Sequence, residues 1–160
     1  MNPLFEKFRK KLTNPVSFRL FLLRGLPSAF FAGLRIHELD EYHATVTAAY
    51  GWFNTNPFRS LYFAIQAMAA EMSTGLLAWG HIYGRDTKVS MLVTGISANF
   101  SKKVTGRIFF SCNEGAAIAN AVEQAVKTGE AVVLDCRSVG LDEKGEVAAE
   151  FMVKWSFKRK

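Results

Sequence analysis

The sequence has little of what metal sites and disulfide frameworks require: two cysteines and three histidines among 160 residues. Cys112 and Cys136 match no metal-ligand spacing, and each sits in a strand-like run where a small buried thiol is common. His37 and His43 have no partner at metal spacing either, so we assign them to polar strand positions. The sequence therefore predicts neither a metal site nor a metal cofactor.

Long apolar, basic and repetitive segments are missing as well. Arg19 and Arg24 divide the apolar run of residues 18–33 into pieces shorter than a usual signal-peptide core, and no segment approaches the length of a membrane span. The formal charge of +6 favours an anionic partner, but no long basic run, zinc-ligand spacing or RNA-binding aromatic signature points to nucleic acid. We expect a one-domain cytoplasmic protein without a transmembrane segment or a nucleic-acid partner.

The most informative stretch, residues 56–79, predicts a long helix. Its larger apolar residues recur at helical spacing: Leu61, Ile65, Met68, Met72, Leu76 and Trp79. The opposite side is also apolar or small, which is typical of a helix surrounded by protein. Four polar residues interrupt it: Gln66, Glu71, Ser73 and Thr74. A carboxylate in such a helix must be paired, hydrogen-bonded or neutral, so Glu71 is the residue that requires an explanation.

Apolar alternation predicts six strands around this helix, together with an amphipathic helix over residues 113–128. The strands cover residues 34–42, 43–50, 88–100, 105–112, 130–139 and 147–157. An antiparallel sheet that wraps one long helix requires that helix to be apolar on nearly every side. The expected fold class is therefore α+β, with a curved six-stranded sheet around residues 61–79.

Two short helices precede the sheet, over residues 1–13 and 15–25, and the first has a basic face. We expect residues 1–32 to form a helical arm and residues 33–160 to form the main domain. The arm is either a lid packed on that domain or a surface that binds a membrane or a partner.

Residues 56–71 carry a recognisable family pattern. The pattern runs Asn, two variable residues, Gly, Thr or Ser, an apolar residue, His, Gly, Gly and, seven residues later, a catalytic Asp or Glu. Laid on this sequence without a gap, its Asn, Thr/Ser, apolar and acid positions fall on Asn56, Ser60, Leu61 and Glu71. By this register, residues 33–158 resemble the hot-dog fold, and in particular the small acyl-CoA thioesterases of phenylacetyl-CoA and hydroxybenzoyl-CoA type.

The pattern is also altered at three places. Arg59 stands at the first Gly and Tyr62 at the His, while Phe63 and Ala64 replace the Gly-Gly pair whose missing side chains let a substrate carbonyl reach the backbone. The sequence is most similar to a branch of hot-dog proteins with an Asn-Pro-Phe opening and a Tyr-Phe pair. The resemblance implies a curved antiparallel sheet around a central helix, assembled as a homodimer or a dimer of dimers.

The resemblance also implies a thioesterase for acyl-CoA or acyl-carrier thioesters, with CoA present only as part of the substrate and no other cofactor. Glu71 would act as general base or nucleophile and, in a dimer, would reach the neighbouring subunit's helix start. The backbone amides of Phe63 and Ala64 would form the oxyanion hole. The candidate substrate contacts are Ser60, Ala67, Thr74, Lys102, Lys103 and Arg107.

Each role has a structural alternative. Glu71 is otherwise a structural carboxylate bound to Tyr62, Ser73 or a partner's arginine. Asn56 is a catalytic residue or a helix N-cap, and Tyr62 is a hydroxyl donor in place of the His or a buried aromatic anchor. The basic residues meet CoA phosphates or form a solvated edge. For the whole protein, the alternative is a non-catalytic acyl-CoA or acyl-chain binding protein whose altered residues 62–64 close the oxyanion site.

Overall fold

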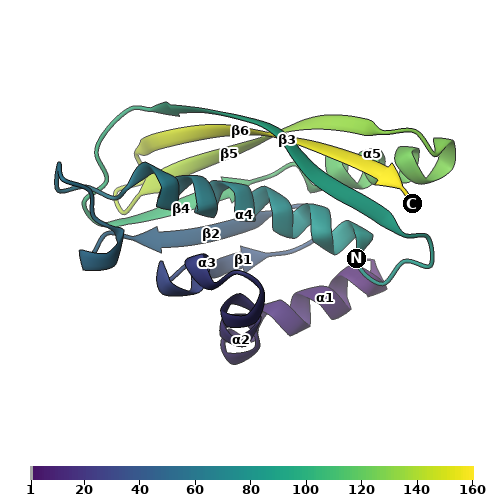
Figure 1. The fold of residues 1–160 in the computed structure, drawn as a ribbon, viewed down its shortest axis with the longest axis horizontal. Coiled ribbons are helices and arrows are strands. Elements are labelled where there is room, and N and C mark those ends of the chain that lie inside the picture. Colours follow the sequence, from purple (N-terminus) through teal and green to yellow (C-terminus); the bar gives the residue numbers. More distant parts are fainter. Residues whose placement is uncertain (1) are drawn as a thin grey trace.

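The structure, a computed structural model that describes residues 2–160, is an antiparallel sheet curved around one long helix (Figure 1). Its strands are β1 (Arg35–Leu39), β2 (Ala44–Ala49), β3 (Val89–Phe100), β4 (Arg107–Cys112), β5 (Val132–Asp142) and β6 (Val147–Arg159). They lie in the order β1-β2-β4-β5-β6-β3, and each neighbouring pair is antiparallel. The expected α+β class and the six expected strands are confirmed.

The helices are α1 (Pro3–Thr13), α2 (Pro15–Gly25), α3 (Pro27–Phe31), α4 (Phe63–Ile82) and α5 (Gly115–Thr128), with a 3-10 turn at Trp52–Asn54. Each of the first three begins at a proline, whose fixed φ suits the first helical turn. Asn14 caps α2 because its Oδ1 accepts hydrogen bonds from the amides of Val16 and Ser17, both at 3.0 Å. No periodic pattern predicts α3 or the 3-10 turn, since both are too short to show one.

The central helix α4 begins at Phe63, two residues later than its apolar spacing predicts. Leu61 instead forms a short bridge with Thr55, and its amide donates to the carbonyl oxygen of Val104 at 2.7 Å. This bridge fixes where the helix starts. Among the described residues no helix combines the length and apolarity needed to cross a membrane.

One side of α4 is enclosed by the sheet and the other is not. Ala69, Ala70, Leu77 and Ala78 are fully buried on the side that contacts β2, β4 and β5. A second set remains only partly buried, at helical spacing: Ala64, Ala67, Met68, Glu71 and Gly75. The expectation of a helix surrounded by protein therefore holds for most of α4, while this face is only partly covered within one chain, by the arm and β3.

The edge strand β3 has an uncovered inner face as well. In its ladder with β6, Ile96 lies opposite Val153 and Phe100 lies opposite Ala149, so each pair shares one face of the sheet. Val153 and Ala149 are fully buried, whereas Ile96 is 52% and Phe100 is 48% exposed. An edge strand of 12 residues with exposed apolar side chains is a template for pairing with another chain.

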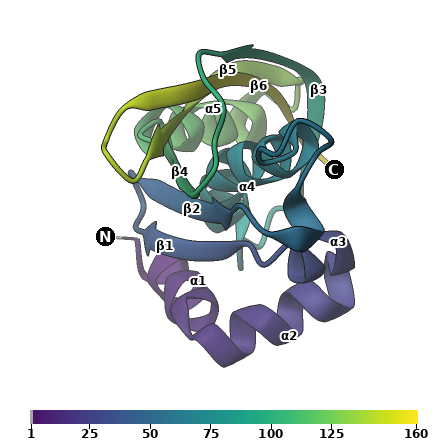
Figure 2. The same cartoon turned by 90° about the vertical axis from the view of Figure 1, so that its left-hand side faces the viewer.

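The N-terminal arm, α1 to α3, shares its core with the rest of the chain. Figure 2 shows α1 and α2 below β1 and α3 at the far end of α2, and α1 contacts β1. Phe5 and Phe8 of α1 are at most 1% exposed, and the Phe8 ring centroid lies 5.1 Å from that of Trp79 on α4. Gly80 permits the close approach of Phe5 to α4, because a Cβ at that position would collide with the Phe5 ring. The arm is therefore packed on the main domain as a lid, through the inner faces of its helices.

Both cysteines and one of the two assigned histidines lie in strands of the sheet, and the other histidine directly precedes a strand. Cys112 in β4 and Cys136 in β5 are fully buried free thiols, and burial raises the pKa of Cys112 to about 11. His37 lies in β1 with its ring centroid 5.2 Å from that of Phe109, and His43 precedes β2. Within residues 2–160 no cluster of His, Cys, Asp or Glu has the makings of a metal site.

Candidate active site

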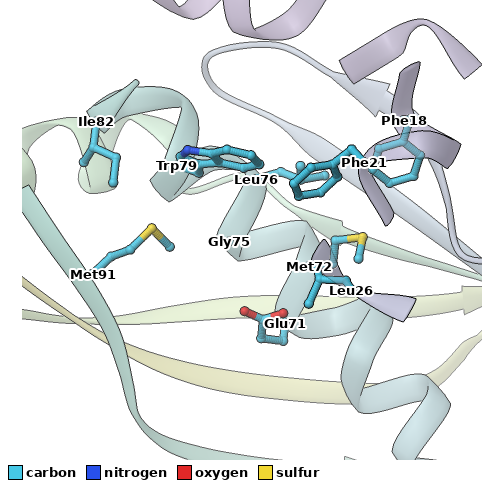
Figure 3. A pocket seen from close by; sticks show the side chains of 10 residues that line it. All are labelled: Phe18, Phe21, Leu26, Glu71, Met72, Gly75, Leu76, Trp79, Ile82 and Met91. Atoms are coloured by element: carbon cyan, nitrogen blue, oxygen red, sulfur yellow. The ribbon is translucent and has the colours of Figure 1, made fainter. Parts of the chain in front are cut away.

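Glu71 projects from the middle of α4 into an apolar cavity of about 360 Å³ (Figure 3). It is the only ionisable residue among those that line the cavity. Figure 3 shows its carboxylate facing a row formed by Phe21, Leu76 and Trp79, with Met91 of β3 to one side. The cavity therefore places one carboxylate against a wall of hydrocarbon.

The Glu71 carboxylate has no hydrogen bond or ion pair to any of residues 2–160. Burial raises the pKa of the carboxyl above its usual value, and no neighbouring charge offsets this effect. The Ser73 hydroxyl is already used, since it donates to the Ala70 carbonyl and pairs with Ser138 Oγ, each at 2.8 Å. The structural alternative within one chain is therefore wrong, and a raised pKa brings Glu71 closer to the range in which a general base is effective.

Gly75 and Thr74 shape the helix around this carboxylate. A Cβ at Gly75 would lie 3.2 Å from Glu71 Oε1 and 3.3 Å from Trp155 Cζ2, so the glycine leaves room for the acid. Thr74 is fully buried: its hydroxyl donates to the Glu71 carbonyl oxygen at 2.8 Å and accepts from Trp155 Nε1 at 2.9 Å. Thr74 thus holds α4 to β6 and lines neither this cavity nor the next one. Ala67 shares the Glu71 face but also lies outside the cavity lining.

A second cavity, of about 570 Å³, lies at the start of α4. It is lined by the loop before the helix, by the first helical turn and by the end of β3, including Asn56, Ser60, Tyr62, Phe63, Gln66, Phe100, Lys102 and Lys103. Asn56 organises the loop: its Oδ1 accepts from the amides of Phe58 at 2.9 Å and Ser60 at 3.2 Å, and its Nδ2 donates to Ser60 Oγ at 3.1 Å. The N-cap alternative for Asn56 is wrong, because no side chain caps α4.

Arg59 explains one departure from the family pattern. Its φ of 57° makes it the only non-glycine residue with a positive φ in the described chain. Glycine adopts this left-handed conformation without steric cost, which accounts for the glycine at this position of the pattern. Arg59 therefore adopts a backbone conformation that a glycine would adopt without strain.

The first turn of α4 presents backbone donors. The amides of Ile65 and Gln66 bond to the Tyr62 carbonyl oxygen at 3.0 and 3.3 Å, while those of Phe63 and Ala64 lack an acceptor within residues 2–160. Tyr62 is 44% exposed, with its ring centroid 5.0 Å from that of Phe63. The alternative of Tyr62 as a buried anchor is therefore wrong, and its hydroxyl-bearing ring belongs to the cavity.

Sequence reasoning overlooks Gln66, which the structure adds to this cavity. Its Nε2 donates to the Leu61 carbonyl oxygen at 3.2 Å, and its Oε1 is buried with no partner in the described chain. The sequence signal that could have indicated Gln66 is its polar side chain, the first in a largely apolar helix and about one turn after the helix start.

The predicted basic residues divide into two kinds. Lys102 forms an ion pair with Asp142 at 2.5 Å and a second one with Glu146, and these acids raise its pKa. Lys103 and Arg107 are exposed and form no ion pair within residues 2–160. Both lie with Lys102 along an adjoining cavity, which the acids Asp142 and Glu143 also line.

No family model matches the sequence, and no curated protein matches it by sequence. Solved structures do match. A protein of unknown function from Pseudomonas aeruginosa, described as a probable thioesterase, is 18% identical with a TM-score of 0.76 over 94% of this chain and 99% of that chain. A protein of unknown function from Chlorobaculum tepidum TLS gives the same values. A thioesterase from Haemophilus influenzae is 12% identical with a TM-score of 0.63 over 90% of each chain.

At these identities, what the proteins share is the fold. The chain has the hot-dog fold. In this hot-dog chain the two parts of the expected site are separate, because Glu71 and Phe63 stand eight residues apart on α4, or about 12 Å along the helix axis. They line different cavities. One chain therefore supplies an acid at one place and free amides at another.

Proposed function

We propose that the protein is a homodimeric thioesterase that hydrolyses an acyl-CoA or acyl-carrier thioester. The observation that carries this proposal is Glu71, an acid without a partner in an apolar cavity, on the central helix of a fold shared with proteins described as thioesterases. An unpaired carboxylate costs folding free energy, so its presence is better explained by chemistry than by stability.

A dimer through β3 would join the two half-sites. Met91, near one end of β3, lines the Glu71 cavity, and Phe100, at the other end, lines the cavity at the helix start. The two residues are about 30 Å apart along the strand. If two copies of β3 pair antiparallel about a two-fold axis, the Phe100 end of one copy lies beside the Met91 end of the other. The pairing would also cover the exposed inner face of Ile96 and Phe100.

In this arrangement Glu71 takes a proton from a water molecule, whose oxygen bonds to the thioester carbonyl carbon. The carbonyl oxygen becomes negative and accepts hydrogen bonds from the amides of Phe63 and Ala64 of the partner subunit. The C–S bond then breaks, and the leaving thiolate takes the proton from Glu71. The products are a carboxylic acid and a free thiol. Alternatively the Glu71 carboxylate attacks directly, which expels the thiolate and leaves a mixed anhydride. Water then hydrolyses the anhydride, which restores the Glu71 carboxylate and releases the carboxylic acid, and the acidic proton neutralises the thiolate.

The remaining residues would serve the substrate around this centre. The Tyr62 hydroxyl is a further donor for the carbonyl, and Asn56 holds the loop that includes Ser60. Lys103 and Arg107 would meet the phosphates of CoA or of a carrier's phosphopantetheine, because neither forms an ion pair in the described chain.

The test is release of free thiol from a series of acyl-CoA thioesters, with Glu71→Gln beside the wild type. We expect a loss of kcat of about 10²–10⁴-fold, the usual contribution of a general base. Glu130→Gln, an exposed acid near the end of α5, is the matched control and should retain full activity. Equal rates for wild type and Glu71→Gln would refute the assignment.

The competing function is a non-catalytic acyl-CoA or acyl-chain binding protein. It is favoured by the side chains of Phe63 and Ala64, which stand where the family pattern has two glycines, with Phe63 55% exposed at the helix start. In that case no thioester is hydrolysed, and saturable acyl-CoA binding is the same for wild type and Glu71→Gln.

A further inference from the structure

The N-terminal arm supplies one wall of the Glu71 cavity. Phe18 and Phe21 of α2 line it together with Leu26, which follows the helix. The Phe21 ring centroid lies 5.1 Å from that of Trp79 on α4 and 6.3 Å from that of Phe18, so three aromatic rings adjoin along this wall. Figure 3 shows Phe21 and Trp79 on the side of the cavity opposite the Glu71 carboxylate.

This wall is held in place rather than loosely attached. Phe18 is 3% exposed and Leu22 is fully buried, so the inner face of α2 is anchored in the core. Arg19 joins α2 to α3: its Nη1 donates to the Phe30 carbonyl oxygen at 2.9 Å, and its guanidinium lies 3.7 Å from the Phe30 ring centroid. The position of Phe21 is therefore fixed by contacts on both sides of it.

We propose that α2 closes the acyl-binding pocket of the thioesterase and that Phe21 sets the length of the acyl group, selecting medium-chain substrates. The inference rests on the proposed function, because it takes the cavity beside Glu71 as the place of the acyl group. The inference adds that the residues selecting the length of the acyl chain lie in the N-terminal arm rather than in the sheet or the central helix.

The chemistry of the lining fits an acyl tail. Glu71 is the one ionisable residue, and the other nine lining residues are apolar or glycine, so a hydrocarbon chain loses no hydrogen bond on entry. A methylene occupies about the volume of a water molecule, about 30 Å³, so a cavity of 360 Å³ holds about twelve heavy atoms. We therefore expect an acyl group of about the size of decanoyl to reach the wall formed by Phe21 and Trp79.

The wall also reaches Glu71 from the right direction. Glu71, Gly75 and Trp79 line the same cavity along α4, so the cavity runs from the acid past the glycine to the aromatic rings. A thioester carbonyl held beside Glu71 would direct its acyl chain along this path, and the chain would end against Phe21 and Trp79.

The experiment compares kcat/KM for saturated acyl-CoAs from acetyl-CoA to palmitoyl-CoA in the wild type, Phe21→Ala, Phe21→Trp and Leu20→Ala. Leu20 is the matched control, because it neighbours Phe21 on α2 but is 49% exposed and does not line the cavity. We expect Phe21→Ala to raise the ratio of palmitoyl-CoA to octanoyl-CoA hydrolysis about 10-fold or more, since each added methylene in a fitted pocket is worth about 10-fold. Phe21→Trp should shift the optimum to shorter chains, and Leu20→Ala should leave the profile unchanged.

A second readout separates this inference from the proposed function. If no acyl-CoA is hydrolysed, the thioesterase proposal fails, and the pocket is then tested by displacement of a fluorescent fatty acid with octanoic or palmitic acid. If Phe21→Ala, but not Leu20→Ala, increases the affinity for palmitic acid relative to octanoic acid, Phe21 limits the length of the bound chain even without turnover. The inference is overturned if Phe21→Ala and Leu20→Ala give the same chain-length profile in the readout that is active.

Discussion

Replacing Glu71 by glutamine is expected to stabilise the protein while it lowers kcat by about 10²–10⁴-fold. The carboxylate is partly buried and has no hydrogen-bond partner among residues 2–160, and glutamine keeps its shape without its charge. A buried charge without a partner costs more than a buried neutral amide, and because Glu71 keeps some solvent contact we expect a gain of about 1 kcal/mol at neutral pH. In a chain of this length that gain raises Tm by about 2–4 °C.

The pH dependence of this gain follows from the raised pKa of Glu71. In the unfolded chain the carboxyl titrates near its ordinary value of 4.5, and in the folded protein it titrates at a higher pH. Below the ordinary value both states hold the proton, so wild type and Glu71→Gln are equally stable. As the pH rises through the window between the two pKa values, the unfolded state loses its proton first, and the wild type loses stability relative to the variant. Above the raised pKa the difference is constant.

The assay is urea unfolding of both proteins over a series of buffers from acidic to mildly alkaline pH, since effects of all other groups cancel in the difference. A variant that is less stable than the wild type at neutral pH would refute the reasoning. That result would mean that the carboxylate is held by donors outside the described chain, such as an arginine of a partner subunit.

Three further substitutions test other parts of the account. Ile96→Lys places a charge on the uncovered inner face of β3 in both subunits of a symmetric dimer and should weaken dimerisation by on the order of 100-fold or more in sedimentation, whereas Ile96→Val should not. Phe63→Pro removes one amide from the first turn of α4 and suits the extended Tyr62 before it, so the helix should persist while kcat falls about 100-fold; Phe63→Ala keeps the amide and should stay active. Arg59→Gly relieves a left-handed backbone and should raise the free energy of unfolding by about 0.5–1 kcal/mol, and a lower Tm would count against the role given to this turn.

The strands and the central helix were open to prediction because their patterns are local. The alternation of Phe151, Val153, Trp155 and Phe157 along β6 reports one buried face, and all four residues are buried in the structure. The register that places Glu71 seven residues after Ala64 is equally local, since it depends only on counting along one helix.

The sequence is less informative about which elements cover each face of a helix, because those contacts join residues far apart in the chain. The spacing on α4 marks both of its sides as apolar, but it does not say that Ala67 and Glu71 lie on the side that one chain covers only in part. In the same way, the apolar spacing of the arm predicts a packed helix without predicting that Phe21 meets Trp79, because that contact joins residues far apart in the chain. Asn56 shows a third limit: an Asn before a helix is read as a cap, yet its side chain turns back onto its own loop.

The central claim is that each active site combines Glu71 of one subunit with the helix start of the other. Mixing addresses it directly: Glu71→Gln and Phe63→Pro, each almost inactive alone, are co-expressed, and the heterodimer is confirmed by native mass spectrometry. Random pairing makes half of the dimers mixed, and each mixed dimer holds one intact shared site, so we predict recovery of about one quarter of wild-type activity. Mixed dimers with no more activity than the two parent variants would contradict the account, because a site contained in one chain cannot be restored by pairing.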